Sequence, residues 1–235
     1  MTTIVSGFIM VNTLRDRDFY IKMSIPLLKL KYPKIIFLEK ESMDLVKHYE
    51  NEYTQFIPFK KDELFLSDKT EQINNAILPI HRNPTKDTKE YMMIQLQKTD
   101  WLKRAIEMNP YQTENFLWID FGIYHIIDDE LVFQKYMKTI MKKTYETIRI
   151  PGCSNPSHTS VVFDKTDWTF CGGIVGGKKE NLLDFHKYVC ETIFYLLTQR
   201  IFCWEVNVWH LVQKNHPELF SWYYANHNLS MLSNY

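Results

Sequence analysis

An apolar segment that ends on a carboxylate is the first candidate for chemistry in this sequence. The run NFLWI at 115–119 has the aromatic and β-branched composition of a strand covered on both faces, and Asp120 and Gly122 follow it. A charge buried there without a partner would be costly, so Asp120 is paired, solvated or functional. Gly122 lets the backbone turn close to a ligand. Such a carboxylate suits metal binding, hydrogen bonds to sugar hydroxyls, or proton transfer.

The metal interpretation of Asp120 is incomplete in the local sequence. The usual Asp-x-Asp pair is absent because Gly122 stands at its second position. A divalent metal at Asp120 would need further oxygen or nitrogen ligands from elsewhere. The nearest chemical candidates are His125, Asp128, Asp129 and His227.

Two later segments also have the composition of a ligand site. In CGGIVGGKK, residues 171–179, the glycines precede a predicted helix start but match neither a P-loop nor a dinucleotide fingerprint. Gly172 and Gly173 therefore line a sugar or acceptor site, or they allow close backbone packing. Glu205 stands beside Trp204 near a helix start, where it either stabilises the helix dipole or binds a sugar hydroxyl.

The elements that must position these residues follow an α/β pattern. Apolar runs and proline stops predict strands early in the chain with helices between them. We expect an α/β sandwich over a mostly parallel sheet, with ligands at the carboxyl ends of the strands, where Asp120 ends the strand 116–120. The predicted strands are 3–11, 34–40, 53–59, 116–120, 144–152 and 159–168. The predicted helices are 17–33, 89–110, 129–143 with Asp128 as N-cap, the segment after the glycine-rich turn 171–179, and 204–220.

Composition sets the outer limits on function. Lys plus Arg and Asp plus Glu both number 28, so no global charge favours a nucleic-acid partner. The four cysteines form no CxxC pair and the start lacks the features of a secretory signal, which predicts a reduced, cytoplasmic protein. The apolar start MTTIVSGFIMV is too short for a transmembrane segment.

Three segments taken together resemble the HtrL/YibB family. They are NPYQTENFLWIDFGIYH, FCGGIVGGKKENLLDFH and WEVNVWHLVQKNHPELFSWYYANHNLSMLSNY, and QKTDWLKRAIEMNP with Lys98 adds a fourth match. The resemblance covers nearly the whole chain. One departure is Asn226 and His227, in a turn where family members carry Gly-Asp-Tyr.

The resemblance implies a glycosyltransferase of the GT-A type, active in glycan biosynthesis. The implied fold is a single domain over residues 1–235, a Rossmann-like α/β/α sandwich with a mostly parallel central sheet. Its N-terminal half would bind a nucleotide sugar, a UDP- or GDP-sugar, and its C-terminal half a glycan or other hydroxyl acceptor. The implied cofactor is a divalent metal, Mn²⁺ or Mg²⁺.

The resemblance also assigns residues to roles. Asp120 would meet the donor's ribose, sugar or metal. His227 would be the C-terminal metal or diphosphate ligand that many GT-A enzymes have, a residue that the HtrL/YibB motif itself does not carry. Glu205, in preference to Asp167, would deprotonate the acceptor if the enzyme inverts, or orient it if the enzyme retains. Positive charge would stabilise the leaving diphosphate. The implied nucleotide and diphosphate residues are Ser6, Gly7, Asn12, Arg15, Arg17 and Lys98, with Gly172 and Gly173 beside them.

Two other functions remain open on the sequence. One is a catalytically silent carbohydrate-binding module that keeps an aromatic-lined cleft. The other is a sugar nucleotidyltransferase, which can share the same sheet and the same carboxylate. The sequence leaves open the donor base, the sugar, the acceptor, the stereochemistry and the oligomeric state.

Overall fold

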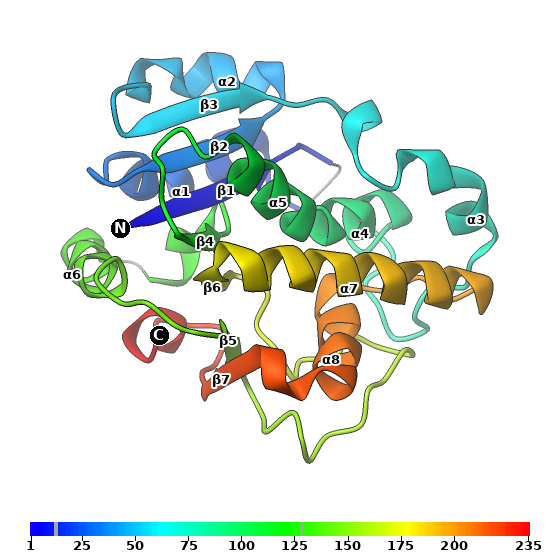
Figure 1. The fold of residues 1–235 in the computed structure, drawn as a ribbon. Coiled ribbons are helices and arrows are strands. Elements are labelled where there is room, and N and C mark those ends of the chain that lie inside the picture. Colours follow the sequence, from blue (N-terminus) through cyan, green and yellow to red (C-terminus); the bar gives the residue numbers. More distant parts are fainter. Residues whose placement is uncertain (12–13, 128) are drawn as a thin grey trace.

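A seven-stranded sheet forms the centre of the computed structural model, which describes residues 1–11, 14–127 and 129–235 (Figure 1). Its strand order is β3-β2-β1-β4-β6-β5-β7. The pairs β1–β2, β2–β3, β1–β4 and β5–β7 are parallel, whereas β6 runs antiparallel to both β4 and β5. The predicted mostly parallel sheet is confirmed. The strands are β1 (Thr2–Phe8), β2 (Lys34–Leu38), β3 (Thr54–Pro58), β4 (Asn115–Ile119), β5 (Ile148–Gly152), β6 (Ile174–Lys178) and β7 (Phe220–Tyr224).

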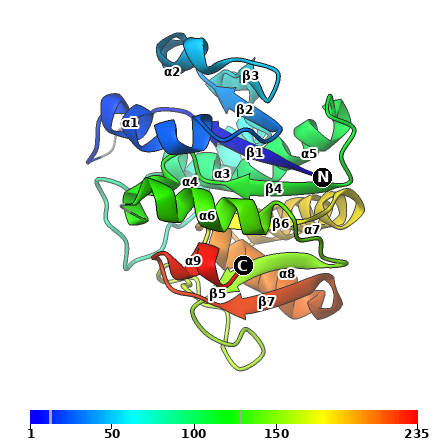
Figure 2. The same cartoon turned by 90° about the vertical axis from the view of Figure 1, so that its left-hand side faces the viewer.

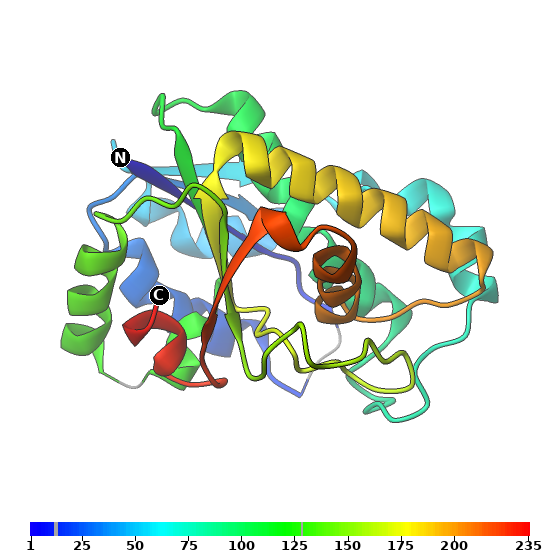
Figure 3. The ribbon, with the colours of Figure 1, turned by 60° about the horizontal axis from the view of Figure 1, so that its bottom comes forward.

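Helices cover both faces of this sheet. One face carries α5 (Lys98–Met108), α7 (Lys179–Thr198) and α8 (Glu205–Asn215), and the other carries α1 (Arg17–Leu28), α6 (Glu130–Ile140) and α9 (Ser230–Ser233) (Figure 3). Figure 2 turns α6 and α9 toward the viewer. Successive strand residues point to opposite faces, so Val5 and Trp118 join one apolar core while Ile4 and Leu117 join the other. The predicted α/β/α sandwich is therefore confirmed.

Three further helices are short. They are α2 (Lys40–Val46), α3 (Thr70–Asn75) and α4 (Lys89–Leu96). Of the described helices, none is both long and apolar enough to cross a bilayer.

The single helix predicted over 89–110 is two helices, α4 and α5. Thr88 caps the first by accepting a hydrogen bond from Tyr91 N–H at 3.1 Å. Buried Gln97 separates the two helices, and its side-chain oxygen accepts from Phe65 N–H at 2.9 Å. The break makes Lys98 the first residue of α5, which directs its side chain toward the carboxyl end of β4.

Two predictions about the second half are wrong. Residues 159–168 form a loop, not a strand, because the side chain of Asn207 holds them: its amide donates to Val162 O and Lys165 O at 2.7 and 2.8 Å. The glycine-rich segment 171–179 holds strand β6, not only a turn. A Cβ on Gly176 would lie 2.7 Å from Leu117 Cδ1 on β4 and closer still to the Tyr235 hydroxyl, so a larger residue would force these buried side chains to shift.

The start of α6 also differs from expectation. Asp129 is the N-cap, and its carboxylate accepts from Val132 N–H at 3.0 Å. The predicted N-cap, Asp128, lies outside the described residues.

Candidate functional site

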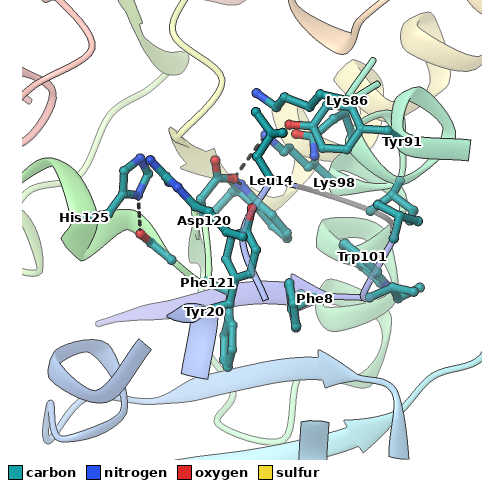
Figure 4. A pocket seen from close by; sticks show the side chains of 18 residues that line it. Phe8, Leu14, Tyr20, Lys86, Tyr91, Lys98, Trp101, Asp120, Phe121 and His125 are labelled. Atoms are coloured by element: carbon teal, nitrogen blue, oxygen red, sulfur yellow. Dashed lines mark hydrogen bonds and ion pairs between the residues drawn. The ribbon is translucent and has the colours of Figure 1, made fainter. Parts of the chain in front are cut away.

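A cleft of about 350 Å³ opens where β1 and β4 end (Figure 4). Parallel strands end at the same edge of a sheet, which is where ligands bind in folds of this kind. Among the described residues that line the cleft, Asp120 is the acidic one, and Arg15, Lys86 and Lys98 are the lysine and arginine residues. Aromatic rings form much of the remaining wall, from Tyr20, Tyr91, Trp101, Trp118 and Phe121.

The turn after β4 delivers the Asp120 carboxylate to the cleft. The backbone N–H of Asp120 donates to Gly173 O at 3.0 Å, and its carbonyl accepts from Ile123 N–H at 2.9 Å. These bonds fix the backbone while the side chain stays 37% exposed. Asp120 therefore lies at the carboxyl end of the central strand β4, as the sequence pattern predicts, and this strand is parallel to β1 and antiparallel to β6.

A buried lysine joins Asp120 to two other parts of the chain. The Lys98 ammonium lies 3.1 Å from Asp120 Oδ1 and 2.9 Å from Glu205 Oε1, and it donates to Gly172 O at 2.9 Å. Trp118 Nε1 donates to the same Oδ1 at 2.7 Å. A lysine has three N–H donors. Lys98 thus has three acceptors, one after β4, one before β6 and one at the start of α8.

The charges of Lys98, Asp120 and Glu205 stabilise one another. Burial lowers the pKa of Lys98, but the charges of Asp120 and Glu205 and the hydrogen bonds to both outweigh burial, so its pKa is raised. Lys98 is therefore a permanent cation beside the cleft. Burial, followed by the charges of Glu205 and Asp120, raises the pKa of Tyr91. Its hydroxyl stays neutral and can donate a hydrogen bond within the cleft.

The predicted nucleotide and diphosphate residues separate into two groups. Gly7, Arg15 and Lys98 line the cleft, and the Arg15 guanidinium lies 4.5 Å from the centre of the Phe19 ring. Ser6 is buried, and its hydroxyl donates to the carbonyl of Ile119 at 2.7 Å. Arg17 pairs with Glu39 at 2.9 Å and does not line the cleft. Asn12 lies outside the described residues.

The two predicted glycines and Glu205 support the site from behind the cleft. A Cβ on Gly172 would lie 3.3 Å from Lys98 Nζ and closer still to Glu205 Oε1. A Cβ on Gly173 would lie 2.9 Å from Ile123 Cδ1. The Glu205 side chain is 7% exposed and does not line the cleft. Close packing against the buried ion pair therefore explains Gly172, and close packing against Ile123 and Met231 explains Gly173.

Asp120 and His227 do not lie together, whereas His125, another candidate ligand, lines the cleft with Asp120. His227 does not line the cleft, and its Nδ1 lies 3.8 Å from Cys153 Sγ. Within the described ranges, no group of three or more His, Cys, Asp or Glu donors surrounds Asp120. Lys98 and Trp118 already occupy Asp120 Oδ1. These residues do not fit a divalent metal held by Asp120 and His227.

Sequence reasoning missed three residues of the site. Trp118 stands two residues before Asp120 in the sequence. Because side chains alternate between the two faces of a strand, the strand pattern could have placed Trp118 on the same face as Asp120. Lys86 and Tyr91 reach the cleft from the segment before α4 and from α4, where the Lys86 ammonium lies 5.3 Å from the Tyr91 ring centre. No local pattern marks either of them.

Asp167, the other carboxylate considered as a base, is buried in a different network. Its Oδ2 lies 2.6 Å from Nδ1 of fully buried His210, and its Oδ1 accepts from Thr169 N–H at 3.1 Å. Burial raises the pKa of Asp167, but the hydrogen bonds from His210 and Thr169 outweigh it, so the pKa is lowered. Asp167 therefore anchors the loop 153–169 and does not line the cleft.

The Asp167→Asn variant is expected to lose about 1–3 kcal/mol of unfolding free energy at pH 7, because it removes a buried hydrogen-bonded charge. A folded-state pKa below the unfolded value of about 3.9 gives stability that is present above that value and is lost as pH falls through the folded pKa. The wild-type protein should therefore lose this contribution below about pH 4, whereas Asp167→Asn should not. Urea unfolding at pH 7 and at acid pH measures both effects. Asp164→Asn, an exposed change in the same loop, is the matched control, and identical acid profiles for the two variants would contradict the assignment.

The whole chain has matches among protein families and among solved structures. The model of a family described as "Bacterial protein of unknown function (HtrL_YibB)" matches residues 1–227. No curated protein matches the chain significantly. Among solved structures, the chain is similar to apo mouse xyloside xylosyltransferase 1, with 12% identity, 96% of this chain and 86% of that chain covered, and a TM-score of 0.47. It is also similar to 4-diphosphocytidyl-2C-methyl-D-erythritol synthase from Anaerococcus prevotii, with 10% identity, 95% and 86% covered, and a TM-score of 0.44.

Proposed function

The chain belongs to the HtrL/YibB family, and from that premise we propose that it is a glycosyltransferase that moves a sugar from a UDP- or GDP-sugar to a glycan or other hydroxyl acceptor. The observation that supports this most is the charge pattern of the cleft. One half-exposed carboxylate, Asp120, lies among the cations Arg15, Lys86 and Lys98 at the carboxyl ends of parallel strands. A nucleotide sugar has the complementary parts, hydroxyl groups and an anionic diphosphate.

The cations are proposed to bind the donor's diphosphate. Negative charge grows on the leaving nucleoside diphosphate as the bond to the sugar breaks, and fixed positive groups stabilise it. Lys98 is held in place by Glu205 and by the carbonyl of Gly172. It therefore needs little reorganisation when the charge develops.

Asp120 is proposed to accept hydrogen bonds from donor hydroxyls. Among the described residues, the contacts of its carboxylate with Lys98 and Trp118 both use Oδ1. Oδ2 thus has no such contact and can face a ligand in the cleft. An ionised carboxylate only accepts hydrogen bonds, so it can bind neighbouring hydroxyl groups of a sugar without needing an acceptor for a proton of its own.

Glu205 is proposed to act through Lys98. It is buried and bound to that lysine, so its role is to hold the cation toward the cleft. Deprotonation of the acceptor by Glu205 stays a prediction from the resemblance.

The divalent metal, Mn²⁺ or Mg²⁺, also stays a prediction. The described donor set does not supply Asp120 with further carboxylate or histidine ligands in one group. The lysine and arginine side chains would therefore neutralise the negative charge of the diphosphate. Nucleotide binding measured with and without manganese tests whether a metal ion does so instead.

The domain organisation is proposed on similar grounds. We propose that residues 1–235 form one domain, with the donor in the N-terminal half and the acceptor in the C-terminal half. All cleft-lining residues that the structure describes fall between Gly7 and His125, which supports the first assignment. A cytoplasmic location and a role in glycan biosynthesis are part of the same proposal.

The function is tested by thermal unfolding with UDP, GDP, CDP and their sugars, with and without manganese. A ligand at 100 times its dissociation constant adds about 2.7 kcal/mol, and each kcal/mol raises Tm by about 2–4 °C for a chain of this size. We expect one nucleotide series to stabilise the protein selectively. Lys86→Met should weaken that binding, whereas Lys40→Met, which removes an exposed lysine paired with Asp44, should not.

Product analysis separates the three functions. A glycosyltransferase slowly releases nucleoside diphosphate from its donor. A sugar nucleotidyltransferase releases pyrophosphate from a nucleoside triphosphate and a sugar phosphate. Absence of both products and of any nucleotide shift would contradict the proposal and favour a carbohydrate-binding module.

A further inference from the structure

A second group of reactive side chains lies outside the cleft and takes no part in the proposed reaction. Cys153 follows β5, Cys171 precedes β6, and His227 follows β7. Their donor atoms all lie within 4.8 Å of one another, and in the part of the chain that the structure describes no other His, Cys, Asp or Glu residues form such a group of three or more. Residues 74 positions apart are thus brought together.

Two of the three distances between these donors are close to those around a single metal ion. Cys153 Sγ lies 3.4 Å from Cys171 Sγ and 3.8 Å from His227 Nδ1. A tetrahedral zinc ion with bonds of about 2.3 Å to sulfur and about 2.0–2.1 Å to nitrogen keeps such ligand atoms roughly 3.5–3.8 Å apart. We propose that Cys153, Cys171 and His227 bind a thiolate-seeking divalent cation, Zn²⁺, with one coordination position open.

The backbone around the two cysteines favours a bridging metal over a disulfide. Cys153 N–H donates to Thr169 O at 2.9 Å and Cys171 N–H donates to Pro151 O at 3.0 Å. The cysteines are therefore diagonal neighbours on antiparallel segments, a relation that places backbones about 7–8 Å apart. Disulfides usually span no more than about 6.8 Å between Cα atoms.

The surroundings orient the imidazole. Trp168 packs against the His227 ring, with ring centres 4.4 Å apart at 78°. Two thiolates and one neutral imidazole would together neutralise a divalent cation. Partial exposure of Cys153 and exposure of His227 leave a path for the ion.

The metal would bear on the cleft only indirectly. Cys171 directly precedes Gly172, whose carbonyl accepts a hydrogen bond from Lys98. Zinc would tie the end of β5, the start of β6 and the segment after β7 into one unit behind that lysine. Its binding does not depend on the proposed transfer of a sugar.

The test uses the whole chain, reduced, freed of metal by a chelator, and titrated with Zn²⁺ or Co²⁺ alone. We expect about one equivalent to bind, and the Co²⁺ form to show thiolate-to-metal charge transfer and the visible bands of a tetrahedral site. Cys153→Ser and His227→Gln should each lower the affinity, by roughly 10-fold or more, and change these bands. Cys190→Ser is the matched control, because Cys190 Sγ also lies beside a histidine, 3.5 Å from His186 Nε2, and it should bind as the wild type does.

Three results would overturn the proposal. The first is wild-type protein that binds no stoichiometric metal with all thiols reduced. The second is Cys153→Ser protein that keeps the wild-type cobalt spectrum and affinity. The third is a Cys153–Cys171 disulfide in the native protein, detected by peptide mass mapping. None of these results would alter nucleotide binding in the cleft, so failure here is distinct from failure of the proposed function.

Discussion

Replacing Lys98 with methionine is expected to lower the free energy of unfolding by about 3–5 kcal/mol, because it leaves buried charge without its partner. Lys98 is the cation that Glu205, 7% exposed, contacts at 2.9 Å, and it also faces Asp120 at 3.1 Å. Without it the two carboxylates would repel each other across the same space. Urea unfolding at neutral pH measures the loss, and nucleotide binding should disappear with it.

Two further variants make the Lys98 experiment decisive. Lys86→Met is the matched control, since Lys86 lines the same cleft but lies over the Tyr91 ring and not in the buried group. It should change stability by no more than about 0.5 kcal/mol. Adding Glu205→Gln to Lys98→Met removes the unpaired buried charge and should recover part of the loss. A Lys98→Met protein as stable as the Lys86→Met protein would show that the ion pair contributes no net stability.

The Asp120→Asn variant is expected to bind the nucleotide sugar about 10- to 100-fold more weakly. Hydrogen bonds to a charged group are worth about 1.5–3 kcal/mol, and each 1.4 kcal/mol is about tenfold in affinity. Asparagine keeps the shape and can still accept the bond from Trp118 Nε1. The loss should therefore come from the missing charge. Calorimetric titration with the nucleotide sugar that stabilises the wild type measures it.

The same variant distinguishes a hydroxyl-binding Asp120 from a metal-binding one. If Asp120 meets sugar hydroxyls, affinity for the bare nucleoside diphosphate should stay equal or rise, because a negative charge near the phosphates has been removed. If Asp120 holds a metal, affinity for the diphosphate should fall as well, and only when manganese is present. Asp44→Asn, an exposed change on α2, should leave all these values unchanged. Unaltered sugar-nucleotide binding in Asp120→Asn would remove Asp120 from the site.

The sequence predicts the part of the site that depends on one strand and its end. An apolar run followed by Asp120 and Gly122 indicates a buried strand with a carboxylate at its carboxyl end, and β4 has that arrangement. Lys98 could be proposed only as a diphosphate ligand. Its bond to Glu205 joins residues 107 positions apart, and no local pattern encodes a contact of that range.

The errors have a common physical origin in tertiary packing. The valine-rich start of 159–168 predicts a strand, but hydrogen bonds from the Asn207 side chain on α8 hold it as a loop. The glycines of 171–179 predict a turn, yet β6 pairs along its length with β4. Glycine weakens a strand by itself. Here, however, a side chain on Gly176 would displace Tyr235 and Leu117, which pack against it.

The buried lysine, Lys98, also bears on when the folding chain becomes able to bind its donor. The described residues of the cleft walls lie between positions 7 and 125. Because synthesis starts at the N-terminus, the ribosome makes all of them before it makes Glu205. Until α8 docks, Lys98 lacks one of its two carboxylate partners. Such long-range contacts are slow to form, since closing a large loop must come first. A nascent chain would therefore contain the residues of the cleft walls before Glu205 fixes the position of Lys98. The protein would bind its donor fully only after the C-terminal half has folded.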